Sequence, residues 1–284
     1  MEVNWFPGHM AKTLRELKEF LKLVDLVIET CDARIPESSR NPELHKLLGQ
    51  KPRILVLNKA DLADTAITNR WIAWYKLQGI TAIACDSHRR TGLPELIKTC
   101  QSMTQLKTDR AMAKGRIFRP IRALVVGIPN TGKSSLINGL CGRKIARTAD
   151  KPGVTRHISW VRSGGQLELL DSPGVLWPRL GDTSSKIRLA ATGAIRDELL
   201  PVEEIASGTL QIMAIEYPGL IRERYKLENL SLSEEELLTE AARQRGCLLS
   251  GGRIDNLRFA ILFLDELRAG KVGRFSLEIP PDKK

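Results

Sequence analysis

The stretch LVLNKAD, from Leu55 to Asp61, places the tetrapeptide Asn-Lys-x-Asp directly after an apolar run. Proteins that read a guanine base carry this tetrapeptide at a strand end, where it normally follows the phosphate-binding loop in the sequence. Here the stretch that matches such a loop, GIPNTGKS from Gly127 to Ser134, comes much later. Either one of the two motifs is accidental, or the chain builds a familiar site from segments in an unfamiliar order.

The later stretch fits the pattern G-x-x-x-x-G-K-[ST] and directly follows the strand-like run RALVVG, which is the context that the pattern requires. In such loops, backbone N–H groups and a helix N-terminus hold phosphates. We expect Lys133 to reach the β and γ phosphates and the Ser134 hydroxyl to bind magnesium. The expected nucleotide-binding residues of this loop are Asn130, Thr131, Gly132, Lys133, Ser134 and Ser135.

Two further stretches supply the remaining parts of a phosphate site. LLDSPG ends an apolar run with Asp171, which is expected to enter the magnesium shell, and Gly174 offers its N–H to the γ phosphate. KPGVTR contains Thr155, which can complete the magnesium coordination when the γ phosphate is present. Taken alone, D-x-P-G is simply a good turn sequence, and an isolated threonine indicates little.

The base-reading residues are expected to be Asn58, Lys59 and Asp61. The Asp61 carboxylate can accept hydrogen bonds from guanine N1–H and the 2-amino group, and Lys59 can lie along the base plane. Ser87, in ACDSHRRTG, follows the next strand-like run, where a backbone N–H can approach guanine O6. A lone N-K-x-D is also a common strand-end turn, but three motifs in suitable contexts make coincidence a poor explanation.

The motif order predicts an α/β fold, with a circularly permuted P-loop GTPase domain over residues 1–180 and a small all-α C-terminal domain over residues 181–284. The basic segment from Lys107 to Pro120 is expected to join the former end of the domain to its former beginning. The new break falls after DSPG, just ahead of the helical domain. We hypothesise that γ-phosphate contacts at Gly174 reposition the C-terminal helices.

Short apolar runs that alternate with helical patterns support this fold class. Strands are predicted at residues 23–31, 53–58, 81–85, 122–127, 157–162 and 167–171, and helices at 10–22, 70–78 and 93–100.

Beyond about residue 180, helical patterns dominate. The residues from Ser233 to Glu236 read as a capping box with Leu232 and Leu237 as its hydrophobic staple, and Gly246 marks the end of that helix. A second amphipathic helix is predicted from the spacing of Ile254, Leu257, Ile261 and Leu264.

The net charge of +11 on 284 residues favours a polyanionic partner, most commonly nucleic acid. The basic residues cluster between Lys107 and Arg122 and between Arg143 and Arg162, although a solvated surface is the alternative explanation. Because aromatic residues are few, we expect contact with the phosphates of structured RNA rather than stacking on single-stranded bases.

Several protein classes are disfavoured. No apolar run approaches the roughly 20 residues of a membrane helix, and the N-terminus lacks the pattern of a signal peptide. We therefore expect a cytoplasmic protein without a membrane contact, and a monomer. Five cysteines without a CxxC pair indicate reduced, mostly buried thiols rather than a disulfide framework or a zinc site.

The stretches NWFPGHM, DARIP, NKAD, GIPNTGKS, PGVT and DSPGVLWP, in this order, resemble those of the ribosome biogenesis GTPase A family of circularly permuted bacterial GTPases. The resemblance covers nearly the whole chain. It implies binding of GTP and GDP, and of a late precursor of the large ribosomal subunit with its rRNA and ribosomal proteins. It also implies slow GTP hydrolysis that the subunit stimulates and that accompanies release. At Ser87, CDS departs from the usual Ser-Ala pair of GTPases, so guanine contact there depends on the backbone.

Catalysis needs a group that orients the attacking water. Many GTPases carry a Gln directly after D-x-x-G, but this position is Val175, which cannot form a hydrogen bond. The resemblance assigns this role to His9, which from the sequence alone is more simply a surface or packing residue. Asn130 resembles the ligand by which some GTPases bind potassium where an arginine finger would otherwise act. Its alternative role is to suit a turn conformation.

Two function classes follow. The preferred one is a GTP-hydrolysing assembly factor of the large ribosomal subunit. The alternative is a GTP-dependent binding switch for another partner, such as a tRNA or a protein complex, and the missing Gln favours it. Within DARIP, Asp32 and Arg34 form either a local ion pair or a surface contact, while Trp5 and Phe6 are expected to pack on the domain or dock on RNA.

Overall fold

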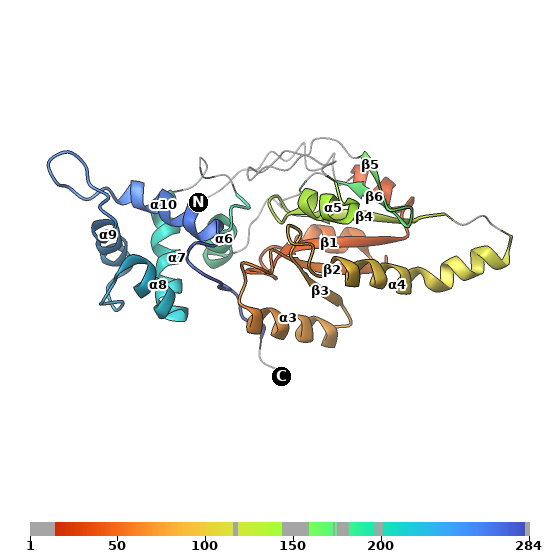
Figure 1. Cartoon of the computed structure of the whole chain (residues 1–284), viewed down its shortest axis with the longest axis horizontal. Coiled ribbons are helices and arrows are strands. Elements are labelled where there is room, and N and C mark those ends of the chain that lie inside the picture. The colour runs from red at the N-terminus through yellow and green to blue at the C-terminus, as the bar shows by residue number, and fades with distance from the viewer. Residues whose placement is uncertain are drawn as a thin grey trace.

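The computed structural model describes residues 15–115, 119–143, 159–172, 174, 182–195, 197 and 201–281. Figure 1 shows two parts, a sheet covered by helices and a bundle of helices beside it. The sheet has six strands in the order β3-β2-β1-β4-β6-β5. Their bounds are β1 Leu26–Asp32, β2 Arg53–Asn58, β3 Thr81–Cys85, β4 Ile121–Gly127, β5 Ser159–Ser163 and β6 Leu167–Asp171.

All neighbouring strands are parallel except β5 and β6. The central strand β1 is buried along its whole length, as expected for a strand covered on both faces. Its register places Asp32 beside Asn58 and Thr30 beside Gly127. The loops that follow β1, β2 and β4 therefore leave the sheet at the same edge.

Helices cover both faces of the sheet. On one face, α4 (Leu93–Ala113) and α5 (Lys133–Cys141) pack on a buried cluster that includes Ile28 and Val125. On the other face lie residues 15–21, which are helical, together with α2 (Pro42–Leu48) and α3 (Thr65–Leu77). Successive side chains along a strand thus pack against helices on opposite faces of the sheet.

The strand predictions are confirmed within a few residues where the structure describes them. β1 begins at Leu26 rather than at residue 23, because Leu23 is exposed and the Asp25 carboxylate accepts from Arg119 at 2.8 Å. Helix α4 is longer than the predicted 93–100 and extends to Ala113. Part of the basic segment that was expected to be a connection is therefore helical.

The helical part contains α6 (Thr183–Ala191), α7 (Val202–Glu216), α8 (Pro218–Tyr225), α9 (Glu234–Gln244) and α10 (Asn256–Arg268). The predicted capping box is confirmed, since the Ser233 N–H donates to Glu236 Oε2 at 3.0 Å and the Glu236 N–H donates to Ser233 Oγ at 3.4 Å. Ile35 and Ile128 of the sheet part belong to the same hydrophobic core as these helices. The two parts therefore share one packed interface.

The predicted second amphipathic helix exists as α10, but its expected apolar face is wrong. Leu257 and Ile261 are 48% and 49% exposed, whereas Phe259 and Phe263 are fully buried. The two phenylalanines, one helical turn apart, contribute the larger apolar area and turn their side of the helix toward the core. Leu264 is buried, as expected.

The chain end returns to the sheet part. After α10 it runs toward α3 (Figure 1), where the Phe275 N–H donates to the Leu62 carbonyl at 3.2 Å. The Trp71 indole N–H donates to the Glu278 carbonyl at 3.0 Å, and the Glu278 carboxylate accepts from the backbone N–H groups of Glu37 and Ser38. This tail, residues 269–281, straps the helices to the sheet.

All five cysteines are free thiols, and all but Cys141 are buried. Among the described residues, no group of three His, Cys, Asp or Glu side chains is placed to hold a metal ion. No helix in the described ranges is long and apolar enough to cross a membrane.

Candidate nucleotide-binding site

The phosphate-loop motif forms a tight turn between β4 and α5. Gly132 has φ 82°, and a Cβ atom there would lie 2.2 Å from Asn58 Nδ2. The Thr131 hydroxyl donates to the Ile128 carbonyl at 3.0 Å and lies 2.8 Å from the Thr30 hydroxyl. The loop therefore needs a glycine at this position and is held in place by β1.

The first turn of α5 is arranged for an anion. Gly132 at the N-cap has no side chain, and no side-chain hydrogen bond caps the helix, which is typical of helix N-termini that bind phosphates. Ser134 and Ser135 lie in this turn. The Lys133 ammonium is buried and donates to the Ile128 carbonyl at 2.8 Å. Burial lowers the pKa of Lys133 to about 8, against the opposing effect of Asp171.

Asp171 ends β6 beside this loop. Burial raises the pKa of its carboxyl to about 6, although Lys133 opposes the shift. Within the described residues, Asp171 Oδ1 is buried without a hydrogen-bond partner. A buried, unpartnered carboxylate oxygen next to a phosphate loop suits a hard cation such as Mg²⁺. The residues present thus fit the magnesium ion that a nucleotide would bring.

Gly174 lies against the same loop. A Cβ atom there would be 2.8 Å from the Pro129 nitrogen and 3.0 Å from Lys133 Nζ. A side chain at this position would occupy the space around the lysine. The D-x-x-G glycine and the P-loop, which are distant in sequence, are therefore in contact.

The loop after β2 is tied to the P-loop by Asn58. Its amide nitrogen donates to the Thr131 carbonyl at 2.9 Å and to the Gly132 carbonyl at 3.3 Å. The Ser87 hydroxyl donates to Asn58 Oδ1 at 2.7 Å. Sequence reasoning considered only the Ser87 backbone and missed this side-chain bond. Asn58 thus connects the loop after β2 with the P-loop.

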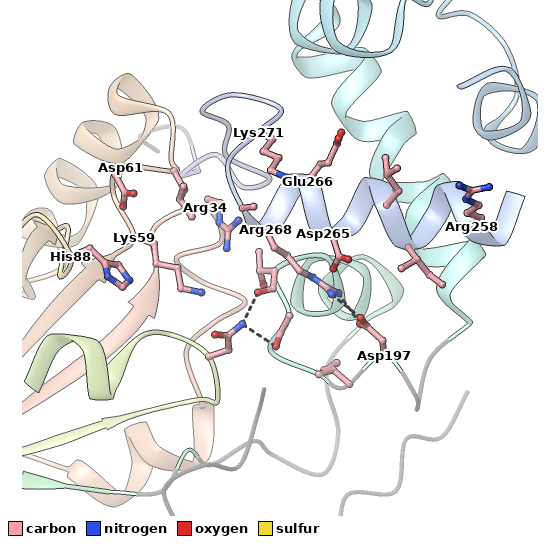
Figure 2. A pocket seen from close by; sticks show the side chains of 18 residues that line it. Arg34, Lys59, Asp61, His88, Asp197, Arg258, Asp265, Glu266, Arg268 and Lys271 are labelled. Carbon is pink, nitrogen blue, oxygen red and sulfur yellow. Dashed lines mark hydrogen bonds and ion pairs between the residues drawn. The ribbon is translucent and has the colours of Figure 1, made fainter. Parts of the chain in front are cut away.

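Lys59 and Asp61 open into a cavity of about 1140 Å³ between the two parts of the molecule (Figure 2). The sheet part contributes charged and polar side chains, among them Arg34, Lys59, Asp61, His88 and Asn130. Helix α10 and the residues after it contribute Arg258, Asp265, Glu266, Arg268 and Lys271. A base bound by Lys59 and Asp61 would therefore face the helical part.

Asn130 joins the P-loop to the helical part. Its amide nitrogen donates to the carbonyl oxygens of Thr192 and Gly193, both at 3.3 Å, after the end of α6. Because the nitrogen is engaged there, the amide oxygen is the atom that Asn130 can offer to a cation. The neighbouring Arg268 forms a bidentate ion pair with Asp197.

The DARIP loop contains a buried ion pair, which settles the alternative that the sequence left open. Arg34 Nε and Nη2 donate to the Asp32 carboxylate at 2.9 and 2.8 Å, and both residues are almost fully buried. Lys59 Nζ lies 3.3 Å from Asp32 Oδ2. Burial alone would raise the pKa of Asp32, but Arg34 and Lys59 lower it to about 2.

The structure thus brings together most of the residues that the sequence nominated, from the loops after β2, β3, β4 and β6. His9, Thr155, Val175, Trp5 and Phe6 lie outside the described residues. Sequence reasoning did not place Asp32 and Arg34 at the site. Their position directly after a strand, at the edge where the motif loops meet, was the available signal.

The sequence is 46% identical over 282 residues to "Ribosome biogenesis GTPase A" of Bacillus cereus. The alignment covers 99% of this chain and 95% of that protein. The chain belongs to the ribosome biogenesis GTPase A family. A family model described as "50S ribosome-binding GTPase" matches residues 122–205.

Solved structures of similar proteins agree with this family. The GDP-bound structure of TM YlqF is similar to the present fold, with a TM-score of 0.70, 29% identity and coverage of 94% of this chain and 100% of that one. GNP-bound YlqF from T. maritima has a TM-score of 0.66 and 28% identity, and covers 96% of this chain and 100% of that one. The predicted α/β GTPase fold with permuted motif order is therefore confirmed.

Proposed function

We propose that this member of the ribosome biogenesis GTPase A family hydrolyses GTP while bound to a precursor of the large ribosomal subunit, and is released or reset by hydrolysis. The supporting observation is the meeting of the NKAD loop, the P-loop and Asp171 at one edge of the sheet. These are the parts that guanine recognition, phosphate binding and metal binding require, and they come from segments in permuted order.

The side chains divide the work. Lys59 and Asp61 hold the base, with the Ser87 backbone near guanine O6, while Asn58 keeps their loop in register with the P-loop. Residues 130–135 and Gly174 hold the phosphates. Ser134, Thr155 and Asp171 would hold magnesium, which would supply positive charge against the charge that develops on the phosphate oxygens. The buried Lys133 supplies a cation next to these oxygens.

Catalysis of hydrolysis is assigned to His9, which orients the attacking water once the ribosomal subunit fixes the N-terminal segment. Asn130 offers its amide oxygen to a potassium ion, whose positive charge would stabilise the phosphates in place of an arginine finger. The contact of its amide nitrogen with the carbonyls of Thr192 and Gly193 supports this orientation. A low intrinsic rate follows, because water is not fixed until the partner binds.

The net positive charge supports a partner rich in phosphates, such as rRNA. Some of the clustered arginines are used within the protein, since Arg119 pairs with Asp25, and Arg122 and Arg162 both pair with Glu168. Arg110 and Arg143 are exposed in the same clusters. Exposed basic residues of this kind are expected to contact RNA and to make binding sensitive to salt.

The experiment measures GTP hydrolysis with and without purified large ribosomal subunits, in potassium and in sodium buffer, for the wild type and His9→Ala. The expected result is strong stimulation by subunits in potassium, and loss of this stimulation in the variant. Equal rates of hydrolysis in the two salts would contradict the proposed potassium site at Asn130. GTP binding without stimulation by subunits would instead support a GTP-dependent binding switch for another partner.

The position of the permutation break supports a second element of the proposal, in which contact of Gly174 with the γ phosphate repositions the helical part. Comparison of small-angle scattering or of interdomain spin-label distances in the GDP and GTP-analogue states tests it. Identical distances in both states would contradict it.

A further inference from the structure

A chain of charged contacts runs from the NKAD loop into the helical part. It begins at Lys59, passes through Asp32 and ends at Arg34, whose Nη1 donates to the Leu267 carbonyl at 3.4 Å. Leu267 lies in the last turn of α10. The last carbonyls of a helix carry the negative end of its dipole, so a guanidinium is a suitable partner for them.

We infer that Asp32 and Arg34 are positioning residues that couple occupancy of the guanine pocket to helix α10. Asp32 holds Lys59 in place for the base, and Arg34 holds the end of α10 against the same carboxylate. This inference rests on the proposed function only in that Lys59 contacts the bound base.

The backbone fixes one end of this chain. Asp32 is the last residue of β1 and lies in register with Asn58, and the Ala33 N–H donates to the Asn58 carbonyl at 2.8 Å. Lys59 has φ 58°, a left-handed backbone conformation that is uncommon for residues other than glycine. The backbone at Lys59 is therefore held in place by its neighbours, and Asp32 is the anion that orients the Lys59 ammonium at the cavity.

Arg34 fixes the other end. It is 1% exposed, its guanidinium carbon lies 5.5 Å from the centroid of the Phe275 ring, and its carbonyl accepts from the Leu277 N–H at 2.8 Å. Phe275 and Leu277 belong to the strap that follows α10. One buried side chain thus contacts the base-reading network, the end of α10 and the returning tail.

Stability alone is a weak reason for such an arrangement. A buried ion pair often contributes no more to folding than apolar residues of the same volume, because two charges lose their hydration. Coupling is the stronger reason, since Lys59, Asp61 and Arg34 line the same cavity as α10. A nucleotide that draws the Lys59 ammonium toward the base moves it away from Asp32. The attraction between Asp32 and Arg34 then changes, and with it the hydrogen bond from Arg34 to the Leu267 carbonyl. By thermodynamic reciprocity, the position of α10 must then also alter nucleotide affinity.

The chain offers a control pair at the opposite end of the same strand, which has the same chemistry but is less buried, since Arg119 is half-exposed. Arg119 Nη1 and Nη2 donate to Asp25 at 2.9 and 2.8 Å, which is the same type of bidentate pair. Asp25 precedes β1, whereas the motif loops follow the strands, and Asp25 and Arg119 do not line the cavity. The double variants D32N/R34M and D25N/R119M each remove one Asp–Arg pair without leaving a lone buried charge.

The test measures GDP affinity by calorimetry and hydrogen exchange of peptides from the end of α10, with and without GDP, for the wild type and both double variants. In the wild type, GDP is expected to slow exchange around residues 265–271. D32N/R34M is expected to bind GDP about tenfold more weakly, as for the loss of one charge-assisted contact, and to lose the slowing. D25N/R119M is expected to keep both.

Several results would overturn the inference. Retained GDP-dependent slowing in D32N/R34M, or its loss in the control as well, contradicts it. GDP binding to the wild type without any effect on α10 contradicts the inference but leaves the proposed function intact, whereas failure of the wild type to bind GDP contradicts the proposed function itself.

If D32N/R34M does not fold, R34K gives a second test. Lysine keeps a cation beside Asp32 but lacks the planar fork that reaches both Asp32 and Leu267. R34K is therefore expected to lose the slowing of exchange in α10 while its GDP affinity falls less than in the double variant. A purely structural role of Arg34 would lower the slowing of exchange and the GDP affinity together, and such a result would contradict the inference.

Discussion

The Ser87 hydroxyl donates a hydrogen bond of 2.7 Å to Asn58 Oδ1. Because the Asn58 nitrogen donates in turn to the Thr131 carbonyl, the end of β3 is connected through the end of β2 to the P-loop. The side chain of Ser87 therefore contributes to the site, although only its backbone was predicted to do so.

Ser87→Ala should weaken GDP binding between about twofold and tenfold, because one neutral hydrogen bond contributes about 0.5–1.5 kcal/mol. The expected cause is a looser Asn58, measured as a faster dissociation rate of a fluorescent GDP analogue. Ser163→Ala is the control, since this buried hydroxyl bonds to the Leu140 carbonyl at the far end of α5. Equal effects of the two substitutions would contradict a specific role for Ser87.

Gly132→Ala should abolish detectable nucleotide binding, because the new Cβ would overlap Asn58 Nδ2, 2.2 Å away. Gly164 is a matched glycine with φ 58° and no atom within 4 Å of the built Cβ. Gly164→Ala should therefore show only the backbone strain, about 1 kcal/mol of unfolding free energy, and normal GDP affinity. Chemical denaturation and equilibrium binding measure the two quantities. Normal binding by Gly132→Ala would show that the P-loop is differently arranged.

The GDP affinity of the wild type should fall as the pH rises above about 8. Burial holds the pKa of Lys133 near 8, so above this pH the side chain must take up a proton before its ammonium can meet phosphate. Well above pH 8, the GDP affinity should fall nearly tenfold per pH unit. Binding should then be accompanied by proton uptake, which calorimetry in buffers of different ionisation enthalpy detects. Lys133→Arg stays charged and should lose this slope, even if its affinity is lower at every pH. A pH-independent wild type would disprove the expectation.

The buried Asp32 should make the protein sensitive to acid. Arg34 and Lys59 outweigh the effect of burial and lower its folded-state pKa from 3.8 to about 2, so the carboxylate stabilises the fold fully above the unfolded value. Its contribution, roughly 2 kcal/mol, is lost as the pH falls from about 4 to about 2. Urea unfolding should show the wild type losing about 1 kcal/mol more than D32N/R34M between pH 5 and pH 3. Parallel pH profiles would rule out this contribution.

Asp171→Asn should remove most of the magnesium dependence of GTP binding. The substituted amide cannot supply the anionic oxygen that Mg²⁺ prefers. In EDTA the variant should bind GTP as well as the wild type, since no metal is then present to need the carboxylate. Glu168→Gln, on the same strand but paired with Arg122, serves as the control and should respond to Mg²⁺ normally. Undiminished magnesium dependence in Asp171→Asn would contradict this assignment.

The parts of the site that depend on local pattern were predictable. Strand ends, a glycine-rich turn and the P-loop lysine follow from short-range sequence, so Asn58, Lys133 and Asp171 were found at the expected edge of the sheet. The contacts of these residues with one another were not predictable. The bond from Ser87 to Asn58 and the contact of Asn130 with Gly193 depend on how separate loops approach, which no local pattern encodes.

Helix α10 shows the same limit in the fold. Its existence follows from apolar spacing, but two apolar faces compete, and the choice of the Phe259 and Phe263 side depends on the core that receives it. The strap at residues 269–281 has no periodic pattern at all. Its position is set by partners such as Leu62, Trp71 and Arg34, which lie more than 200 residues earlier.

The strap also imposes an order on folding during synthesis. Strands β1 to β3 and the segments between them emerge first. The contacts of Leu62, Arg34 and Trp71 with Phe275, Leu277 and Glu278 must wait until residues 269–281 have left the ribosome. The nascent chain therefore carries a sheet whose motif-bearing edge still lacks these contacts, and the strap can hold the helices over that edge only after residues 269–281 have emerged. A chain truncated before residue 269 would lack these contacts, even if it retained every nucleotide-binding motif.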